Sequence, residues 1–184
     1  MNEETITLDG LRTIAVGDRA SARAVVVLLH GFMMRPEDLA PFGHSLGGSR
    51  YYLFPEGPLD VETGGRAWWR IDPKARDAAI AKGPRDFAEQ DPPDLPAIRD
   101  RLVRVWDEAA RLCPNVPLVV GGFSQGGMLT ADTYLHAPRS VAGMVLLSAS
   151  RIAFAHWPPF LHHAKGLETP KNGSISPCKC IDRP

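Results

Sequence analysis

A glycine-flanked serine between an apolar run and a helical pattern constrains this chain more than any other feature. Residues 118–135 read LVVGGFSQGGMLTADTYL, and the segment GFSQG around Ser124 fits the pattern G-x-S-x-G. Between a strand and a helix, this pattern is typical of a tight turn that projects a serine hydroxyl from a sheet edge. Side chains at Gly122 and Gly126 would obstruct neighbouring backbone in such a turn. We therefore predict that Ser124 occupies a strained strand-to-helix corner and is a candidate nucleophile, the alternative being a glycine-rich turn with an incidental serine.

The order of the remaining patterns predicts the fold class. Two runs, AVVVLLHGF (24–32) and VAGMVLLSAS (141–150), are apolar on both faces, as expected of buried parallel strands. A helix is expected from Pro36, an aromatic strand at 51–54, and an amphipathic helix over 94–112. This alternation predicts an α/β fold, a mostly parallel sheet with helices on both faces. The carboxyl ends of its strands would then converge on one edge, where ligands bind in such sheets.

Three further segments carry weaker signals. Two alternating stretches on either side of Asp9-Gly10 predict an N-terminal hairpin. Asp94 is a predicted N-cap for the amphipathic helix, with Pro96 in its first turn. Residues 55–96 are turn-rich and without clear periodicity, and so long an irregular stretch usually carries function.

Composition excludes several classes of protein. The 184 residues suffice for one domain, and the 21 Lys plus Arg balance the 21 Asp plus Glu, so bulk charge favours neither nucleic acid nor a membrane surface as partner. No run approaches the length of a membrane span, and MNEETITLDG has no signal-peptide pattern, so we expect a cytoplasmic protein. Cys113, Cys178 and Cys180 do not have zinc-site spacing. We expect no metal and no organic cofactor.

Three motifs follow one another along the chain: LHGF at 29–32 with EDL at 37–39, then FPEGP at 54–58 with GGRAWW at 64–69, then GFSQGG at 122–127. Together they resemble the phospholipase/carboxylesterase family of α/β-hydrolases, which includes the acyl-protein thioesterases. The first strand ends in HGF rather than G-x-G-x-x-G, which disfavours a dinucleotide-binding domain. The resemblance implies the α/β-hydrolase fold and cleavage of a small-molecule carboxylic ester or thioester through an acyl-enzyme.

The resemblance also implies roles for particular residues. Ser124 would be the nucleophile, and the backbone N–H groups of Phe32 and Gln125 would form the oxyanion hole. His30 resembles a structural histidine that hydrogen-bonds neighbouring backbone. Trp68 and Trp69 would wall the acyl pocket, the alternative being that they anchor their loop on the core.

The acid and base of a catalytic triad are not identifiable. The family places both after Ser124, in segments that are missing here. Asp132 and His136 lie eight and twelve positions along the helix, more than about 10 Å away, and are expected to pair on the helix surface. The remaining candidates are His156, His162 and His163 as bases and Asp182 as an acid, none with a clear pattern. The alternative function is therefore a catalytically incomplete hydrolase that at most binds an acyl ligand.

The end of the chain departs from the family. From Glu168 the sequence reads like an unrelated translation, as a frameshift or premature stop would produce. We expect residues 1–165 to form an incomplete α/β-hydrolase domain without its last strands and helices, and 166–184 to be a disordered tail. The strand at 141–148 would then be an exposed apolar edge, through which a homodimer could form.

Overall fold

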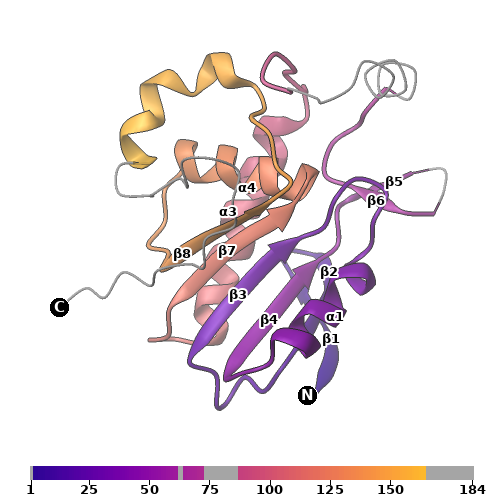
Figure 1. Ribbon diagram of the computed structural model, residues 1–184, viewed down its shortest axis with the longest axis vertical. Helices are drawn as coiled ribbons and strands as arrows, with labels where there is room; N and C mark the ends of the chain where they lie inside the picture. The colour runs from indigo at the N-terminus through magenta and orange to yellow at the C-terminus, as the bar shows by residue number, and fades with distance from the viewer. Residues whose placement is uncertain (1, 62–63, 73–86, 165–184) are drawn as a thin grey trace.

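A six-stranded mixed sheet organises the molecule (Figure 1). The computed structural model describes residues 2–61, 64–72 and 87–164, and the statements below concern these residues. In spatial order the strands are β1 (Glu3–Leu8), β2 (Leu11–Val16), β4 (Arg50–Pro55), β3 (Ala24–Leu29), β7 (Leu118–Phe123) and β8 (Gly143–Leu147). The β4, β3, β7 and β8 strands are parallel, while β1–β2 and β2–β4 are antiparallel. The predicted mostly parallel sheet is confirmed.

The central strands are buried on both faces, as their unbroken apolar sequences predict. In β3, Val25, Val27 and Leu29 belong to one core cluster. Val26 and Leu28, which point the other way because side chains alternate along a strand, belong to a second cluster. Burial on both faces explains why this strand has no polar position.

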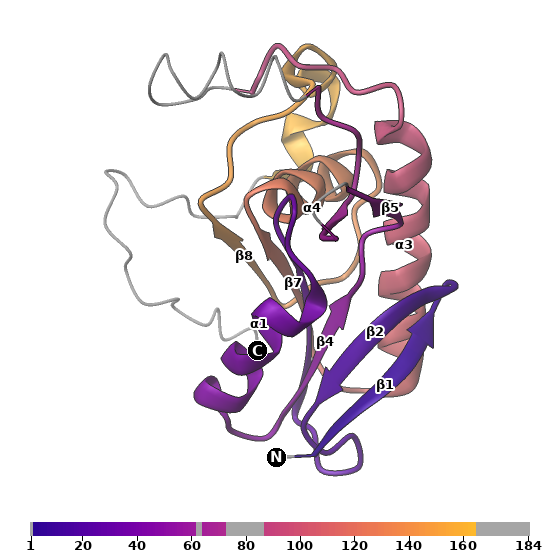
Figure 2. The ribbon, with the colours of Figure 1, turned by 90° about the vertical axis from the view of Figure 1, so that its right-hand side faces the viewer.

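Helices cover the two faces of the sheet (Figure 2). The helix α1 (Pro36–Leu46) packs Leu39 and Ala40 into the smaller cluster. The helices α3 (Leu95–Leu112) and α4 (Gln125–His136) pack into the larger cluster on the opposite face. The α3 helix starts where predicted, but the Asp94 side chain makes no capping hydrogen bond, so its predicted role as a side-chain cap is wrong.

The N-terminal hairpin is confirmed and is held by α3. Asp9 and Gly10 form its turn with φ of 43° and 74°, the left-handed values that a two-residue hairpin turn requires. The Asp9 carboxylate accepts a hydrogen bond of 2.8 Å from the Arg104 guanidinium. The Asp9 carbonyl accepts one of 2.7 Å from Arg101.

The stretch expected to be irregular contains a short hairpin. The strands β5 (Leu59–Asp60) and β6 (Arg66–Ala67) pair antiparallel, and two residues are too few for periodicity to reveal. After β8, two 3-10 helices follow, η1 (Phe154–His156) and η2 (Pro158–Ala164). The predicted tail at 166–184, with Asp182, Cys178 and Cys180, lies outside the described residues, as do 73–86.

Two features are absent from the described residues. None of their helices is long and apolar enough to cross a membrane. They contain no group of three or more His, Cys, Asp or Glu side chains that could hold a metal ion. Cys113 is a free, buried thiol, and burial raises its pKa.

Candidate active site

Ser124 lies at a sharp corner between β7 and α4. Its backbone has φ 51° and ψ −114°, a conformation that L-residues rarely adopt. Its N–H donates to the Leu147 carbonyl at the end of β8 (2.8 Å), and its carbonyl accepts the first helical hydrogen bond from Met128 (2.9 Å). Strain of this kind persists only where surrounding contacts hold it in place. The side chain is half-buried.

The two glycines of the motif are required by close backbone approach. A Cβ on Gly122 would lie 2.5 Å from the carbonyl carbon of Gly126. A Cβ on Gly126 would lie 2.5 Å from the carbonyl oxygen of Leu29, at the end of the neighbouring strand. Both distances are below those that real Cβ atoms show, so only glycine fits the corner.

His30 is a structural histidine, as expected. The Gly57 N–H donates to its Nε2 (2.8 Å), so the ring proton is on Nδ1, which donates to the Gly31 carbonyl (2.7 Å). Burial lowers the pKa of His30, which keeps the ring neutral. A neutral ring that both accepts and donates fixes the FPEGP turn against the end of β3.

Trp68 and Trp69 are each 1% exposed and belong to the larger core cluster. The Trp68 indole N–H donates to the His30 carbonyl (2.8 Å), and its ring packs at a tilt on the His30 imidazole. This arrangement agrees with the alternative interpretation, in which the two tryptophans anchor their loop on the core. A contact of either indole with an acyl group stays a prediction.

The segments that contain Phe32 and Gln125 lie at one edge of the sheet. Their strands, β3 and β7, pair in parallel up to Leu29 and Gly122, so both chains leave the sheet at the same end. Gln125 is the first residue of α4, where backbone N–H groups have no acceptor within the helix. The N–H of Met33, next to Phe32, donates to the Arg66 carbonyl (2.9 Å).

No described side chain hydrogen-bonds the Ser124 hydroxyl. Every histidine in the described part of the chain has another partner, namely His30 with Gly31 and Gly57, His44 with Glu3, His136 with Asp132, His156 with Asp91, His162 with Pro159 and His163 with Leu135. The His156–Asp91 contact (2.8 Å) is on the surface, with side chains 56% and 59% exposed.

Asp132 differs from the sequence expectation. It lies four residues before His136 and contacts it at 3.4 Å, but its side chain is completely buried rather than on the helix surface. It accepts hydrogen bonds of 2.9 Å from Arg99 of α3 and from the indole of Trp157. The surface-pair prediction is wrong because Arg99 of α3 and Trp157, between η1 and η2, cover this face of α4.

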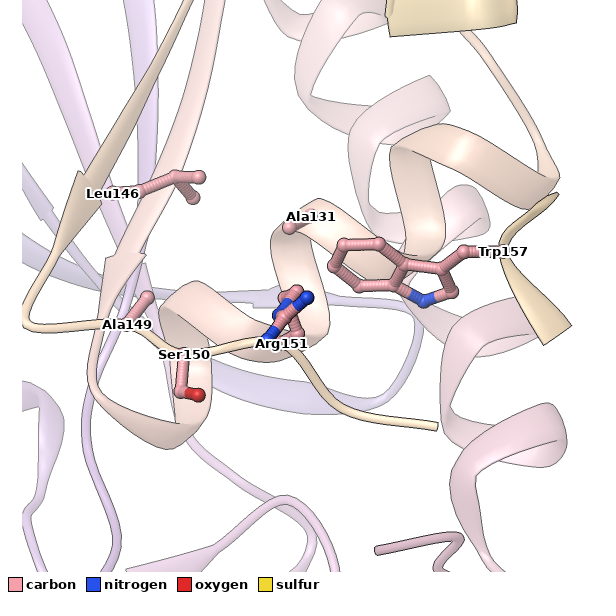
Figure 3. Close-up of a pocket in the computed structure, with 6 residues that line it drawn as sticks. All are labelled: Ala131, Leu146, Ala149, Ser150, Arg151 and Trp157. Atoms are coloured by element: carbon pink, nitrogen blue, oxygen red, sulfur yellow. The ribbon is translucent and has the colours of Figure 1, made fainter. Parts of the chain in front are cut away.

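A shallow pocket opens beside α4. Its volume is about 400 Å³, and its lining comprises Ala131, Leu146, Ala149, Ser150, Arg151 and Trp157. Figure 3 shows Leu146 and Trp157 on opposite sides, with Ala131 and Arg151 between them. Ser124 is not among the residues that line this pocket, although Ala149 lies against Gly127 in the first turn of α4.

Sequence reasoning missed one element of the site. The Gln125 carboxamide contacts the backbone of Trp68 and Trp69 (2.9 Å each), and no local pattern indicates contacts over more than 50 residues. Ser148, just after β8, lies at this edge, as its place at the end of a buried strand predicts, and its φ of 50° is positive like those of Met33 (66°) and Ser124 (51°).

Comparisons with known proteins identify the family. The family model described as Phospholipase/Carboxylesterase matches residues 12–170. No curated protein matches the chain. Among solved structures, a carboxylesterase from Mesorhizobium loti is 20% identical, with a TM-score of 0.63 over 91% of this chain and 84% of that one. The Bacillus cereus carboxylesterase is 22% identical, with a TM-score of 0.56 over 76% of this chain and 60% of that one.

Esterase PE8 is 20% identical, with a TM-score of 0.58 over 76% of this chain. The chain spans 64% of the length of that esterase. At these identities the structures establish the fold, and the family model establishes the relationship. The chain therefore has the α/β-hydrolase fold and belongs to the phospholipase/carboxylesterase family.

Proposed function

We propose that this protein is a serine hydrolase that cleaves a small-molecule carboxylic ester or thioester through an acyl-enzyme on Ser124. The observation that carries the proposal is the backbone of Ser124, held at φ 51° and ψ −114° between a buried strand and a helix. A non-glycine residue in this conformation is unfavourable by about 1–3 kcal/mol, and such strain is concentrated at functional sites. Membership of the phospholipase/carboxylesterase family supports the same reaction class.

The proposed chemistry is acyl transfer in two steps. The Ser124 hydroxyl oxygen attacks the ester carbonyl carbon, and its proton passes to a base and then to the leaving alcohol or thiol. The N–H groups of Phe32 and Gln125 would stabilise the oxyanion, and the latter sits at the positive end of the α4 dipole. Water then hydrolyses the acyl-enzyme and releases the acid.

A fluorophosphonate probe tests this proposal, because it labels serines that are activated as nucleophiles. We expect slow labelling of the wild type, and complete loss of labelling in Ser124→Ala, with intact mass spectrometry as the measurement. Labelling that persists in Ser124→Ala, or none of the wild type even after prolonged exposure, would contradict the nucleophile assignment. Hydrolysis of a p-nitrophenyl ester by the two proteins provides the parallel kinetic comparison.

A second candidate function is a catalytically incomplete hydrolase that binds an acyl ligand without turnover. It is favoured by the absence, among residues 2–61, 64–72 and 87–164, of any side chain that hydrogen-bonds the Ser124 hydroxyl. Without a base, hydrolysis falls to what the oxyanion hole and substrate binding supply, still about 10³–10⁴-fold above water in the best-studied serine protease. Slow labelling with near-background turnover is the outcome that this function predicts.

We also propose that two copies of the chain associate through β8. In the described sheet β8 pairs with β7 alone, and its five residues, Gly143–Leu147, contain no charge. Leu146 on this strand is 45% exposed, beside the shallow pocket. An uncharged apolar edge strand has a free row of backbone donors and acceptors, which a second strand can pair with.

A further inference from the structure

The side chain of Gln125 joins the nucleophile corner to the Trp68–Trp69 segment. The carboxamide oxygen accepts a hydrogen bond from the Trp68 N–H, and the carboxamide nitrogen donates to the Trp69 carbonyl, both at 2.9 Å. The residue is completely buried. Because one contact needs an acceptor and the other a donor, the orientation of the amide group is fixed by its partners.

The same segment is bound on its other side to the turn after β3. The Met33 N–H donates to the Arg66 carbonyl (2.9 Å), and the Arg66 N–H donates to the Met34 carbonyl (3.0 Å). The Trp68 indole adds a hydrogen bond to the His30 carbonyl. Gly65 permits this approach, since a Cβ there would lie 2.1 Å from the Met33 carbonyl oxygen.

The Arg66 side chain fixes this segment to the turn after β4. Its guanidinium donates to the Gly57 carbonyl (2.8 Å) and forms an ion pair with Glu56 at 3.7 Å. Gly57 in turn donates to His30. Residues 65–69 are therefore connected to both segments that carry the proposed oxyanion donors. Backbone hydrogen bonds connect them to the turn after β3, which contains Phe32, and the Gln125 side chain connects them to α4.

We infer that the Gln125 carboxamide is a positioning residue for the oxyanion hole. This inference rests on the proposed function and deepens it. The Gln125 side chain holds residues 66–69 against the start of α4, and Arg66 in that segment is hydrogen-bonded to Met33. Because Phe32 precedes Met33, these contacts fix the position of the Phe32 N–H relative to the Gln125 N–H. A displacement of one donor by about 1 Å reduces turnover by about 10²-fold, because oxyanion stabilisation depends on fixed geometry.

Two substitutions of Gln125 distinguish a role in positioning the oxyanion donors from a role in the stability of the fold. Gln125→Met has a similar volume but makes neither hydrogen bond. Gln125→Glu keeps the acceptor for the Trp68 N–H, but as a carboxylate it has no donor for the Trp69 carbonyl. Once protonated, the glutamic acid has both an acceptor and a donor and can restore both contacts. Thr13→Val is the matched control, because it removes a buried side-chain hydrogen bond (3.2 Å) to the Leu11 carbonyl in β2, which is not among the contacts of Gln125.

The kinetic readout is Ser124-dependent hydrolysis of p-nitrophenyl acetate, measured as the difference from Ser124→Ala. We expect Gln125→Met to lower kcat by about 10- to 100-fold with KM within about threefold, and Thr13→Val to change neither. For Gln125→Glu, the ratio of its kcat to the wild-type kcat should rise as pH falls from 8 to 5. A folded Gln125→Met with wild-type kcat, or a Gln125→Glu ratio that does not vary with pH, would overturn the inference.

A second readout does not depend on turnover. Amide hydrogen exchange at Met33 and Arg66 should accelerate in Gln125→Met and stay unchanged in Thr13→Val, because the inferred coupling runs through these two hydrogen bonds. Unchanged exchange would refute the coupling. If the wild type shows no Ser124-dependent hydrolysis at all, the proposed function fails, and the exchange rates alone decide whether Gln125 couples the two turns.

Discussion

At the scale of single residues, the site contains positions at which an added Cβ atom would not fit. The Ser124 corner has space for glycine alone at Gly122 and Gly126, because each faces backbone atoms that cannot move without breaking the sheet or the helix. His30 similarly depends on a single proton, since a doubly protonated ring could not accept from the Gly57 N–H.

Gly122→Ala and Gly126→Ala should each lower the free energy of unfolding by about 1–3 kcal/mol, because the added methyl group collides with backbone at about 2.5 Å. Urea denaturation followed by circular dichroism measures the change. Gly143→Ala in β8 is the control and should change stability by less than about 0.5 kcal/mol, since no atom lies within 4 Å of its added Cβ. Equal effects at Gly122 and Gly143 would argue against the steric explanation.

Stability should fall as pH decreases below about 6.5, the ordinary pKa of histidine, because burial lowers the pKa of His30 in the folded protein. Between the lowered and the ordinary pKa the unfolded chain binds more protons, so this contribution is complete above pH 6.5 and is lost below it. His30→Gln keeps an acceptor for the Gly57 N–H and does not titrate, so its denaturation midpoint should fall less steeply with pH.

The control for this titration is His44→Gln, which removes an exposed histidine paired with Glu3 on another face of the protein. Its pH profile should remain closer to that of the wild type below pH 6.5. If the stability of His30→Gln instead falls with pH in parallel with that of the wild type, protonation of His30 is not the cause of the pH dependence.

At the scale of elements, buried polar groups decide how the helices sit on the sheet. Asp132 of α4 contacts Arg99 of α3 and Trp157, the residue between η1 and η2, so one carboxylate joins two helices and the segment after β8. A buried carboxylate is tolerated only when its hydrogen bonds are complete, and here a guanidinium and an indole supply them.

Asp132→Asn should lower the free energy of unfolding by about 3 kcal/mol, because it leaves the Arg99 guanidinium partly buried without its counter-charge. Thermal and urea denaturation measure the loss. Asp107→Asn makes the same chemical change at an exposed ion pair with Arg139 and should cost less than about 1 kcal/mol. A loss at Asp132 no larger than that at Asp107 would refute the structural role.

At the scale of the whole molecule, the sheet has two edges with different characters. The β1 edge carries Glu3 and Glu4, whereas the β8 edge is uncharged. Charged residues on an edge strand oppose pairing with another chain, so the β1 edge is protected and the β8 edge is suited to association.

Sedimentation velocity at micromolar concentration should therefore show a dimer, and Leu146→Lys should convert it to a monomer. Leu46→Lys is the matched control: Leu46 is 61% exposed on α1, away from β8, and its replacement should leave the dimer intact. A wild-type monomer at this concentration, or a dimer that Leu146→Lys does not weaken, would exclude association through β8.

The sequence by itself determined the features that depend on neighbours along the chain. Alternation and apolar runs determine which segments become strands. The Asp9-Gly10 pair determines a turn, and the glycines around Ser124 determine a corner, because each is a matter of local backbone geometry. The family motifs predicted the fold for the same reason, since each motif lies on one element and its junction.

The tertiary structure alone decided which side chains meet. Gln125 and Trp68 are 57 residues apart, Asp132 and Trp157 are 25 apart, and His156 and Asp91 are 65 apart. Such contacts result from how sheet and helices pack, and no periodicity in the chain encodes them. For this reason the sharp corner at Ser124 could be predicted from the sequence, whereas the hydrogen bonds around it could not.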